Sequence, residues 1–322
     1  TLGAQNGERV FDYGFEQRVR NENWNNIFDW NDTLDDQRVQ VRYRTRLWFK
    51  GPLSTNVDFH AGLNQETCQI VTPGTPFKFD EVIFETAYLD FKKLFVKGLS
   101  LRVGRQNLVK GEGFLFLEGT PYDGSRTIYS NAAVLAYAFR KSKIEAIGIF
   151  NPRTDRFLPR IHNRSRQLIE WDDRAAGLYY TGNQNRRTAL ETYWFLKKES
   201  GDRRAATHPQ YQPGLHVHTA GARVVRRLGG RWSVTGELAR QWGGRDDGKT
   251  IAGLGGYGYL KRSFGGRKQH AASIGYYGMS GDDPATRGRV EGWNPLFSRW
   301  PKWSEMLIYS QFREVGAAYW TN

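Results

Sequence analysis

A two-residue alternation between residues 37 and 49 constrains the fold of this chain more than any other feature. Every second position is Val39, Val41, Tyr43, Thr45, Leu47 or Phe49, and all but the threonine are apolar. The positions between them carry Arg38, Gln40, Arg42, Arg44 and Arg46. Successive side chains of a β-strand point to opposite faces, so this segment predicts a strand with one apolar face and one arginine-rich face.

The same two-residue alternation recurs along the chain and predicts an all-β fold of long antiparallel strands. We expect fourteen strands, at residues 9–23, 36–50, 54–64, 81–92, 98–109, 126–140, 142–152, 174–182, 187–198, 215–228, 231–242, 250–263, 269–279 and 306–321. Short connections alternate with longer polar ones. This asymmetry between the two strand ends is typical of an up-and-down β-barrel in a bacterial outer membrane.

The composition excludes membrane-spanning helices but is compatible with a barrel. Charged residues make up 25% of the chain, and its mean hydropathy is -0.66. No run approaches the roughly 18 consecutive apolar residues of a transmembrane helix. A barrel strand crosses the bilayer with about 10 residues, of which only every second one must be apolar. Aromatic residues reach 14%, which suits strands that end at a membrane interface.

The charge balance predicts an interior that attracts anions. Lysine and arginine number 47 against 33 acidic residues, and arginine outnumbers lysine 33 to 14. A guanidinium stays ionised and can hold a carboxylate with two hydrogen bonds. Our candidate pore residues in the first such strand are Arg38, Arg42, Arg44 and Arg46, with Glu85 and Asp123 as neighbouring carboxylates that temper the field. Alternatively, any one of these arginines simply pairs with an acid and stiffens the wall.

Four segments resemble the family of outer-membrane alginate-export proteins. They are Leu101–Gln106, Gly111–Gly113, Gly119–Arg126 and Asn294–Glu305. The resemblance implies a monomeric barrel of 18 strands with an electropositive pore for an anionic polysaccharide, and it adds Arg105, Asp123 and Arg126 to the candidate pore residues. Strand parity places Arg102 and Arg105 on opposite faces unless a bulge intervenes. With fourteen strands visible, we expect about four closing strands to be missing at the C-terminal end.

These observations predict one outer-membrane barrel domain over residues 1–322, acting as a passive, anion-selective channel without enzymatic activity, cofactor or metal. The expected partners are an acidic polysaccharide or small anion, outer-membrane lipid and possible envelope proteins, but no nucleic acid. Two alternatives stay open: a general porin or importer of small anions, and a structural barrel with a closed pore. His216 and His218 share a strand face, but no third metal ligand is evident.

Overall fold

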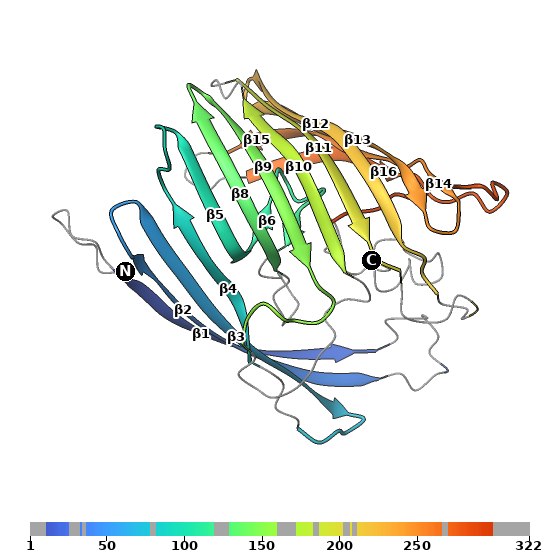
Figure 1. Ribbon diagram of the computed structural model, residues 1–322. Coiled ribbons are helices and arrows are strands. Elements are labelled where there is room, and N and C mark those ends of the chain that lie inside the picture. Colours follow the sequence, from blue (N-terminus) through green and yellow to red (C-terminus); the bar gives the residue numbers. More distant parts are fainter. Residues whose placement is uncertain are drawn as a thin grey trace.

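The protein is an all-β structure dominated by one large antiparallel sheet (Figure 1). The computed structural model describes residues 11–25, 33, 37–77, 82–118, 129–159, 172–182, 187–201, 207, 211–265 and 270–298. The long strands are β1 (Asp12–Trp24), β2 (Arg38–Pro52), β3 (Val57–Thr72), β4 (Val82–Phe91), β5 (Leu99–Gln106), β8 (Ser130–Phe139), β9 (Ser142–Asn151), β10 (Asp173–Gly182), β11 (Thr188–Glu199), β12 (Leu215–Gly229), β13 (Trp232–Arg245), β15 (Leu254–Phe264) and β16 (His270–Met279). The described residues include no helix long and apolar enough to cross a membrane.

Four two-residue strands complete the described secondary structure. They are β6 (Leu108–Val109), β7 (Leu117–Glu118), β14 (Thr250–Ile251) and β17 (Arg289–Val290). β6 and β7 form a separate hairpin, and β14 pairs with both β13 and β17 at the margin of the large sheet. None of the four was predicted as a strand of its own, because two residues are too few to show a period.

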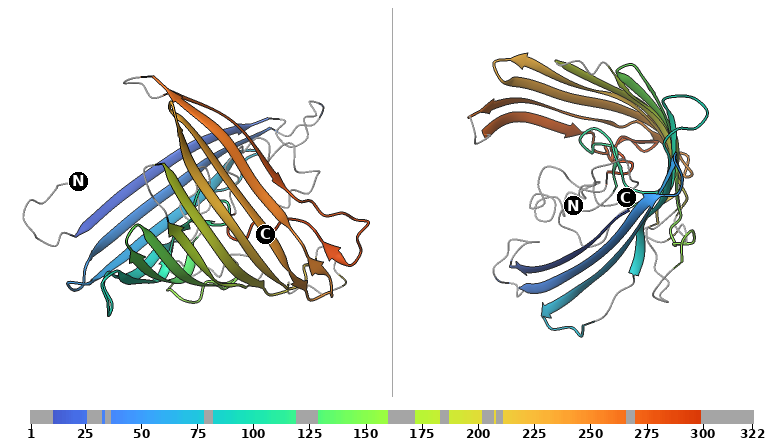
Figure 2. Two further views of the ribbon diagram at one scale, coloured as in Figure 1. Left: turned by 90° about the horizontal axis from the view of Figure 1, so that it is seen from above. Right: turned by 90° about the vertical axis from the view of Figure 1, so that its left-hand side faces the viewer.

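The long strands follow a meander in which each strand pairs antiparallel with its neighbours in the sequence. The sheet curves into a trough with a convex and a concave side, and β1 and β16 are its outermost strands (Figure 2). Thirteen of the predicted strands are confirmed, with shifted ends. The predicted strand at 306–321 lies outside the described residues, so closure of the sheet into one barrel domain and the number of closing strands stay predictions.

The two faces of the sheet have the polarity that the alternation predicts. Apolar side chains are exposed on the convex face, among them Tyr13, Phe15 and Leu238, which are 77%, 61% and 61% exposed. Their neighbours Asp12, Glu16 and Glu237 lie on the concave face and are partly or fully buried. A water-soluble sheet would bury its apolar face rather than expose it. The arrangement is that of a wall that meets lipid on the outside and a polar interior on the inside.

The apolar core lies inside the trough rather than between two layers. It is built from inner loop 1 (residues 107–118) and inner loop 2 (residues 291–298), which both lie within the curve of the sheet (Figure 2, right). Phe116 and Phe297 at its centre have no exposed surface. The loops pack on the concave side of the sheet, at Ile147, Ile149, Ala175, Phe195 and Ala239. The interior beside β9–β13 is therefore filled by protein.

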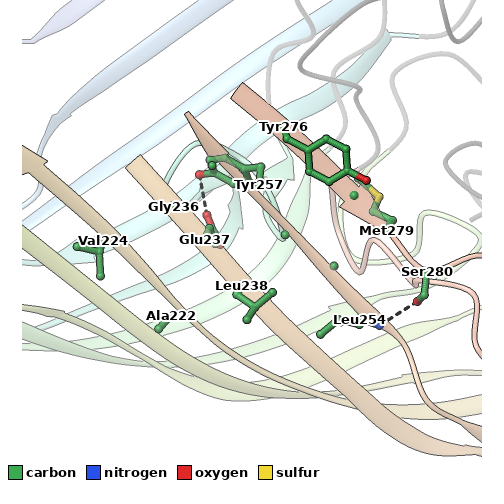
Figure 3. Close-up of a pocket in the computed structure, with 14 residues that line it drawn as sticks. Ala222, Val224, Gly236, Glu237, Leu238, Leu254, Tyr257, Tyr276, Met279 and Ser280 are labelled. Atoms are coloured by element: carbon green, nitrogen blue, oxygen red, sulfur yellow. Dashed lines mark hydrogen bonds between the residues drawn. The ribbon is translucent and has the colours of Figure 1, made fainter. Parts of the chain in front are cut away.

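The convex face is hollowed where β12, β13, β15 and β16 lie side by side. A pocket of about 810 Å³ opens there (Figure 3). The hollow exists because Gly236, Gly256 and Gly278 leave outward positions without side chains, while Leu238 and Tyr276 stand beside it. Since the pocket lies on the exposed apolar face, it does not belong to the polar interior.

Candidate functional site

An arginine cluster covers the concave face of β1 and β2. The pairing of these strands sets Arg18 beside Arg44 and Arg20 beside Arg42. Like charges at paired positions repel, and nearby carboxylates offset this repulsion. A nitrogen of Arg44 lies 2.6 Å from Glu16, the Nε atom of Arg42 lies 3.1 Å from Glu22, and Arg20 also pairs with Glu22. Arg42 and Arg44 are thus held in place by acids of the neighbouring strand, and Arg20 by an acid of its own strand.

Arg46 is the most fully bonded member of this cluster. Its Nε atom donates to both carboxylate oxygens of Glu85 at 2.9 Å, and Nη2 donates to Glu85 at 2.5 Å. A second carboxylate, that of Glu16, lies 3.6 Å away. Although the guanidinium is bonded on two sides, the side chain keeps 17% of its surface exposed. Arg46 is therefore fixed in direction and still open to the interior.

A β-bulge explains why Glu85 faces the interior. The pairing of β3 with β4 shifts between Gly62 and Leu63, which are opposite Thr86 and Phe84, so Glu85 is the extra residue. A bulge changes the face on which the following residues emerge. Tyr88 and Asp90 therefore share the concave face with Glu85. Without the bulge, the even-numbered residues Tyr88 and Asp90 would face away from the odd-numbered Glu85. The sequence alone gave no sign of this shift.

The predicted pore residues of β2 all lie on the concave face, but their selectivity role stays a prediction. Arg42 and Arg44 pair with carboxylates as described above, which is the arrangement that stiffening of the wall also requires. Arg38 differs from them, because its guanidinium lies over the ring of Trp24, 5.4 Å from the ring centre. Asp123 and Arg126 lie outside the described residues.

Arg105, another candidate pore residue, is buried and ion-paired within the fold, and its pore role stays a prediction. It pairs with Asn131 on the face that carries the exposed Val103, opposite to Arg102. Its guanidinium donates two hydrogen bonds to Asp155, at 2.8 and 2.6 Å, and one to the carbonyl of Phe84 at 2.9 Å. The residue is only 2% exposed. Arg105 therefore joins the ends of β4 and β5 to Asp155. Its positive charge is paired with that carboxylate within the fold.

Inner loop 1 is fixed to the concave wall by two ion pairs. The Nζ atom of Lys110 donates to Glu145 at 2.6 Å, and the Nη2 atom of Arg223 donates to Glu112 at 3.2 Å. The hydroxyl of Tyr259 also donates to Glu112, at 2.5 Å. Loss of hydration lowers the pKa of the Lys110 ammonium, and the Glu145 carboxylate opposes this effect. The loop is thus bound to strands on both sides of the core.

Arg223 also belongs to a buried polar network in the wall. Its Nη1 atom donates to Glu191 at 2.8 Å, and its Nε atom donates to the hydroxyl of Tyr257 at 3.2 Å. Tyr193 and Tyr257 both donate to Glu237, at 2.9 and 2.8 Å. Buried polar networks stabilise a fold only when their members are satisfied. This network supports the contact between β12 and inner loop 1.

Inner loop 2 is held by two buried side chains of the wall. The Nζ atom of Lys197 donates to the carbonyl of Leu296 at 2.8 Å and lies 2.6 Å from Glu199. Gln241 forms a pair of hydrogen bonds with the backbone of Asn294, donating at 2.6 Å and accepting at 2.8 Å. The amide and the ammonium together fix the backbone of the loop at two adjacent points.

The two inner loops also bind each other. The rings of Phe116 and Phe297 stack with their centres 5.3 Å apart. Phe297 donates its backbone N–H to the carbonyl of Leu115 at 3.0 Å, and the hydroxyl of Ser298 donates to the carbonyl of Gly113 at 2.5 Å. Two segments that were distant in the sequence, and were singled out by their resemblance to one family, therefore form one internal plug.

His216 and His218, which share a strand face and could suggest a metal site, lie among aromatic rings. The ring of His218 stacks between Trp194 and Trp242, with ring centres 5.7 and 5.5 Å away. Within the described part of the chain, no group of three or more His, Cys, Asp or Glu side chains is placed to hold a metal ion. We therefore make no metal assignment to His216 and His218.

Comparisons with known proteins gave matches among solved structures but none by sequence. No protein family model and no curated protein sequence matches the chain, so the resemblance to alginate-export proteins stays a prediction. The trimer form of OmpT, an outer-membrane protein of Vibrio cholerae folded in vitro, is 9% identical, with a TM-score of 0.38 over 88% of this chain and 94% of that chain. A mutant of OmpT that lacks loop L8 is 11% identical, with a TM-score of 0.37 over 84% and 94% of the two chains.

Proposed function

We propose that this protein is an outer-membrane barrel that conducts anions passively through an arginine-lined interior. The observation that supports the proposal best is the reversed polarity of the sheet, with exposed apolar side chains outside and ion-paired arginines inside. Beside Arg38–Arg46 on the concave side of β1–β4, six arginines lie among four carboxylates, namely Arg18, Arg20, Arg38, Arg42, Arg44 and Arg46 among Glu16, Glu22, Glu66 and Glu85. Asp12, Lys50, Asp58 and Asp90 share this side nearer to the short turns. The local excess of positive charge beside Arg38–Arg46 favours anions over cations.

The proposed substrate class is an acidic polysaccharide of the alginate type. A uronate carboxylate matches the flat donor pair of a guanidinium, and several weak contacts in series allow release after each step. A wall of arginines, most of them partly exposed and already sharing their charge with a carboxylate, fits weak binding better than tight binding. Small organic anions have the same carboxylate chemistry and define the alternative of a general porin or importer.

A second candidate function is a barrel whose pore is closed within a larger envelope assembly. The specific observation in its favour is the internal plug, because inner loops 1 and 2 fill the space beside β9–β13 with a buried apolar core. Such a core obstructs passage unless the loops move. Conductance measurements distinguish the two functions.

Replacing Arg42, Arg44 and Arg46 with serine is expected to shift the selectivity toward cations. The change removes three positive charges and leaves Glu16, Glu22 and Glu85 without these partners. In planar bilayers under a potassium chloride gradient, we expect the chloride-to-potassium permeability ratio to fall about threefold or more. Oligouronates added to the wild-type protein should block the current, and the variant should be blocked less.

The matched control removes three positive charges from the convex face, by replacing Arg174, Lys198 and Arg240 with serine. All three side chains are exposed on the side away from the interior. This control should keep the wild-type permeability ratio. An equal shift in both variants would show that net charge, rather than the interior arginines, sets the selectivity. A folded wild-type protein without any conductance would contradict the channel and favour the closed barrel.

Glu85→Gln should have the opposite effect on selectivity. The substitution keeps the size of the side chain but removes the negative charge that Arg46 contacts, so the interior gains net positive charge. We expect the chloride-to-potassium ratio to rise, by less than about twofold, because Arg46 keeps Glu16 nearby and salt screens the change. Asp247→Asn, in the exposed turn after β13 at the long-loop end, should leave the reversal potential unchanged. A fall in the ratio after Glu85→Gln would contradict the assigned orientation of Glu85.

A further inference from the structure

The short turns of the sheet form a rim of exposed positive charge. They lie along the upper left edge of the sheet in Figure 1. Their exposed cations are Lys92, Lys93, Lys97, Arg140, Lys141, Arg187, Arg226, Arg227, Arg231, Lys261 and Arg262, which we call the basic rim. The described parts of these turns, at 92–98, 140–143, 187–188, 226–232 and 261–265, contain no acidic residue. Ion pairs at this end join Lys92 to Asp58 of β3, at 2.6 Å, and Lys143 to Glu145 of β9, at 3.1 Å.

The opposite end of the strands has a different charge pattern. Its described loops carry acids beside their cations, for example Asp246 and Asp247 near Arg245, and Glu291 near Arg289. The Arg245–Asp247 and Arg289–Glu291 pairs have separations of 3.1 and 3.5 Å. The excess of cations at the short-turn end is thus a property of that end and not of connections in general.

Large apolar side chains stand at the same level as the basic rim. Phe95 is 91% exposed between Lys93 and Lys97, and Phe139 precedes Arg140 with 39% exposure. Leu228, Trp232 and Phe264 are likewise 55%, 38% and 46% exposed in their turns. Exposed aromatic residues interleaved with cations are typical of the boundary between the hydrocarbon and the head groups of a bilayer.

We propose that the basic rim binds the head groups of anionic phospholipids in the membrane leaflet on its side. The inference rests on the proposal that the sheet spans a membrane, but it does not depend on conduction through the interior. Juxtamembrane lysine and arginine side chains attract anionic lipid, and each adds a contribution of similar size. The apolar side chains continue the exposed convex face up to the level of the cations.

The distribution of the charges favours lipid over a soluble acidic partner. The cations occur in every described turn from β4–β5 to β15–β16 instead of forming one patch. A folded partner would cover one sector of this arc, whereas lipid surrounds all of it. The repeated combination of a cation with an apolar side chain also matches a phospholipid, which has a charged head group and an acyl chain.

The test measures the preference of the inserted protein for phosphatidylglycerol over phosphatidylcholine, with spin-labelled lipids in vesicles. The rim variant replaces Lys93, Arg140 and Arg226, which lie in three different turns, with glutamine. The control variant replaces Lys249, Arg287 and Arg289 at the opposite end with glutamine. We expect the wild type and the control to prefer phosphatidylglycerol at least about threefold, and the rim variant to lose roughly a quarter of the underlying free energy, because three of eleven similar contributions are removed.

Each outcome bears on a separate statement. No preference in the wild type, or an equal preference in the rim variant, would overturn the lipid-binding rim while leaving the membrane-spanning barrel intact. Failure of correctly folded wild type to insert into either kind of vesicle would overturn the membrane proposal and the rim with it. Suppression of the phosphatidylglycerol signal by soluble polyglutamate at physiological salt would instead favour an acidic soluble partner and contradict the lipid assignment.

Discussion

Replacing both Phe116 and Phe297 with alanine is expected to open the interior of the protein. Neither side chain has exposed surface, and their stacked rings join the two inner loops. Phe116 also packs edge-on against Phe195 of the wall, with ring centres 4.8 Å apart. Removing a buried phenylalanine ring typically costs about 3–5 kcal/mol. Since most of these contacts hold the loops to each other and to the wall, the loss should release the plug.

We expect the single-channel conductance of this double variant to exceed that of the wild type about twofold or more, because an opened interior admits more ions. The current should also fluctuate more, since the released loops would move in and out of the path. Planar-bilayer recordings measure both properties. Hydrogen exchange of residues 293–298 should become faster in the same variant, which reports release of inner loop 2 independently of conductance.

The control for this variant removes two phenylalanine rings from the convex face. Phe15 and Phe264 are 61% and 46% exposed, so their replacement with alanine leaves the plug untouched. It should change neither conductance nor exchange at residues 293–298. If the Phe116 and Phe297 variant exchanges faster but conducts like the wild type, the loops do not limit conduction. Unchanged exchange would contradict the stabilising role that we assign to the two rings.

The strands could be predicted well because alternation reports the two environments of a curved sheet. The eighth predicted strand, 174–182, is found at Asp173–Gly182, and the seventh, 142–152, at Ser142–Asn151. The third was predicted as 54–64 but extends from Val57 to Thr72. Its second half contains the run Asn64–Thr67, which is polar on both faces. A strand that is polar on both faces shows no period, so its end could not be placed.

The candidate site was harder to predict, because it depends on contacts between distant segments. The ion pairs of Arg44 and Arg46 join three strands, and a bulge that leaves no mark in the sequence turns Glu85 inward. The inner loops did carry one signal. Phe114, Leu115, Phe116 and Leu117 are four consecutive apolar residues in a segment between two predicted strands. Such a run is unusual for a solvated loop and indicates burial.

Lys197 was also missed, and its neighbour shows why. Lys197 and Lys198 are adjacent and chemically identical, so composition cannot distinguish them. Strand alternation places the two lysines on opposite faces of β11. Inner loop 2 packs over Lys197 on the concave face, and this packing could not be predicted from the sequence. Lys197 is 1% exposed as a result, whereas Lys198 is exposed. A charge this deeply buried must be paired to be tolerated.

Lys197→Met is expected to cause a large loss of stability. The ammonium lies 2.6 Å from Glu199 and 3.6 Å from Asp173, which is itself fully buried. Its removal would leave two carboxylates without their cation and the carbonyl of Leu296 without its donor. Removing one partner of a buried ion pair costs about 3–5 kcal/mol. Urea unfolding in detergent micelles should show this loss, with faster hydrogen exchange at residues 293–298.

Lys198→Met provides the matched control, since the same chemical change occurs one residue away on the exposed face. Its unfolding free energy should stay within about 0.5 kcal/mol of the wild type. A rescue variant that combines Lys197→Met with Asp173→Asn and Glu199→Gln should regain part of the lost stability, because no unpaired charge is then buried. If Lys197→Met and Lys198→Met were equally stable, the ammonium would not hold inner loop 2. If the rescue failed while the single variant was unstable, the hydrogen bond to Leu296 and the contact with the Phe297 ring would outweigh the carboxylates.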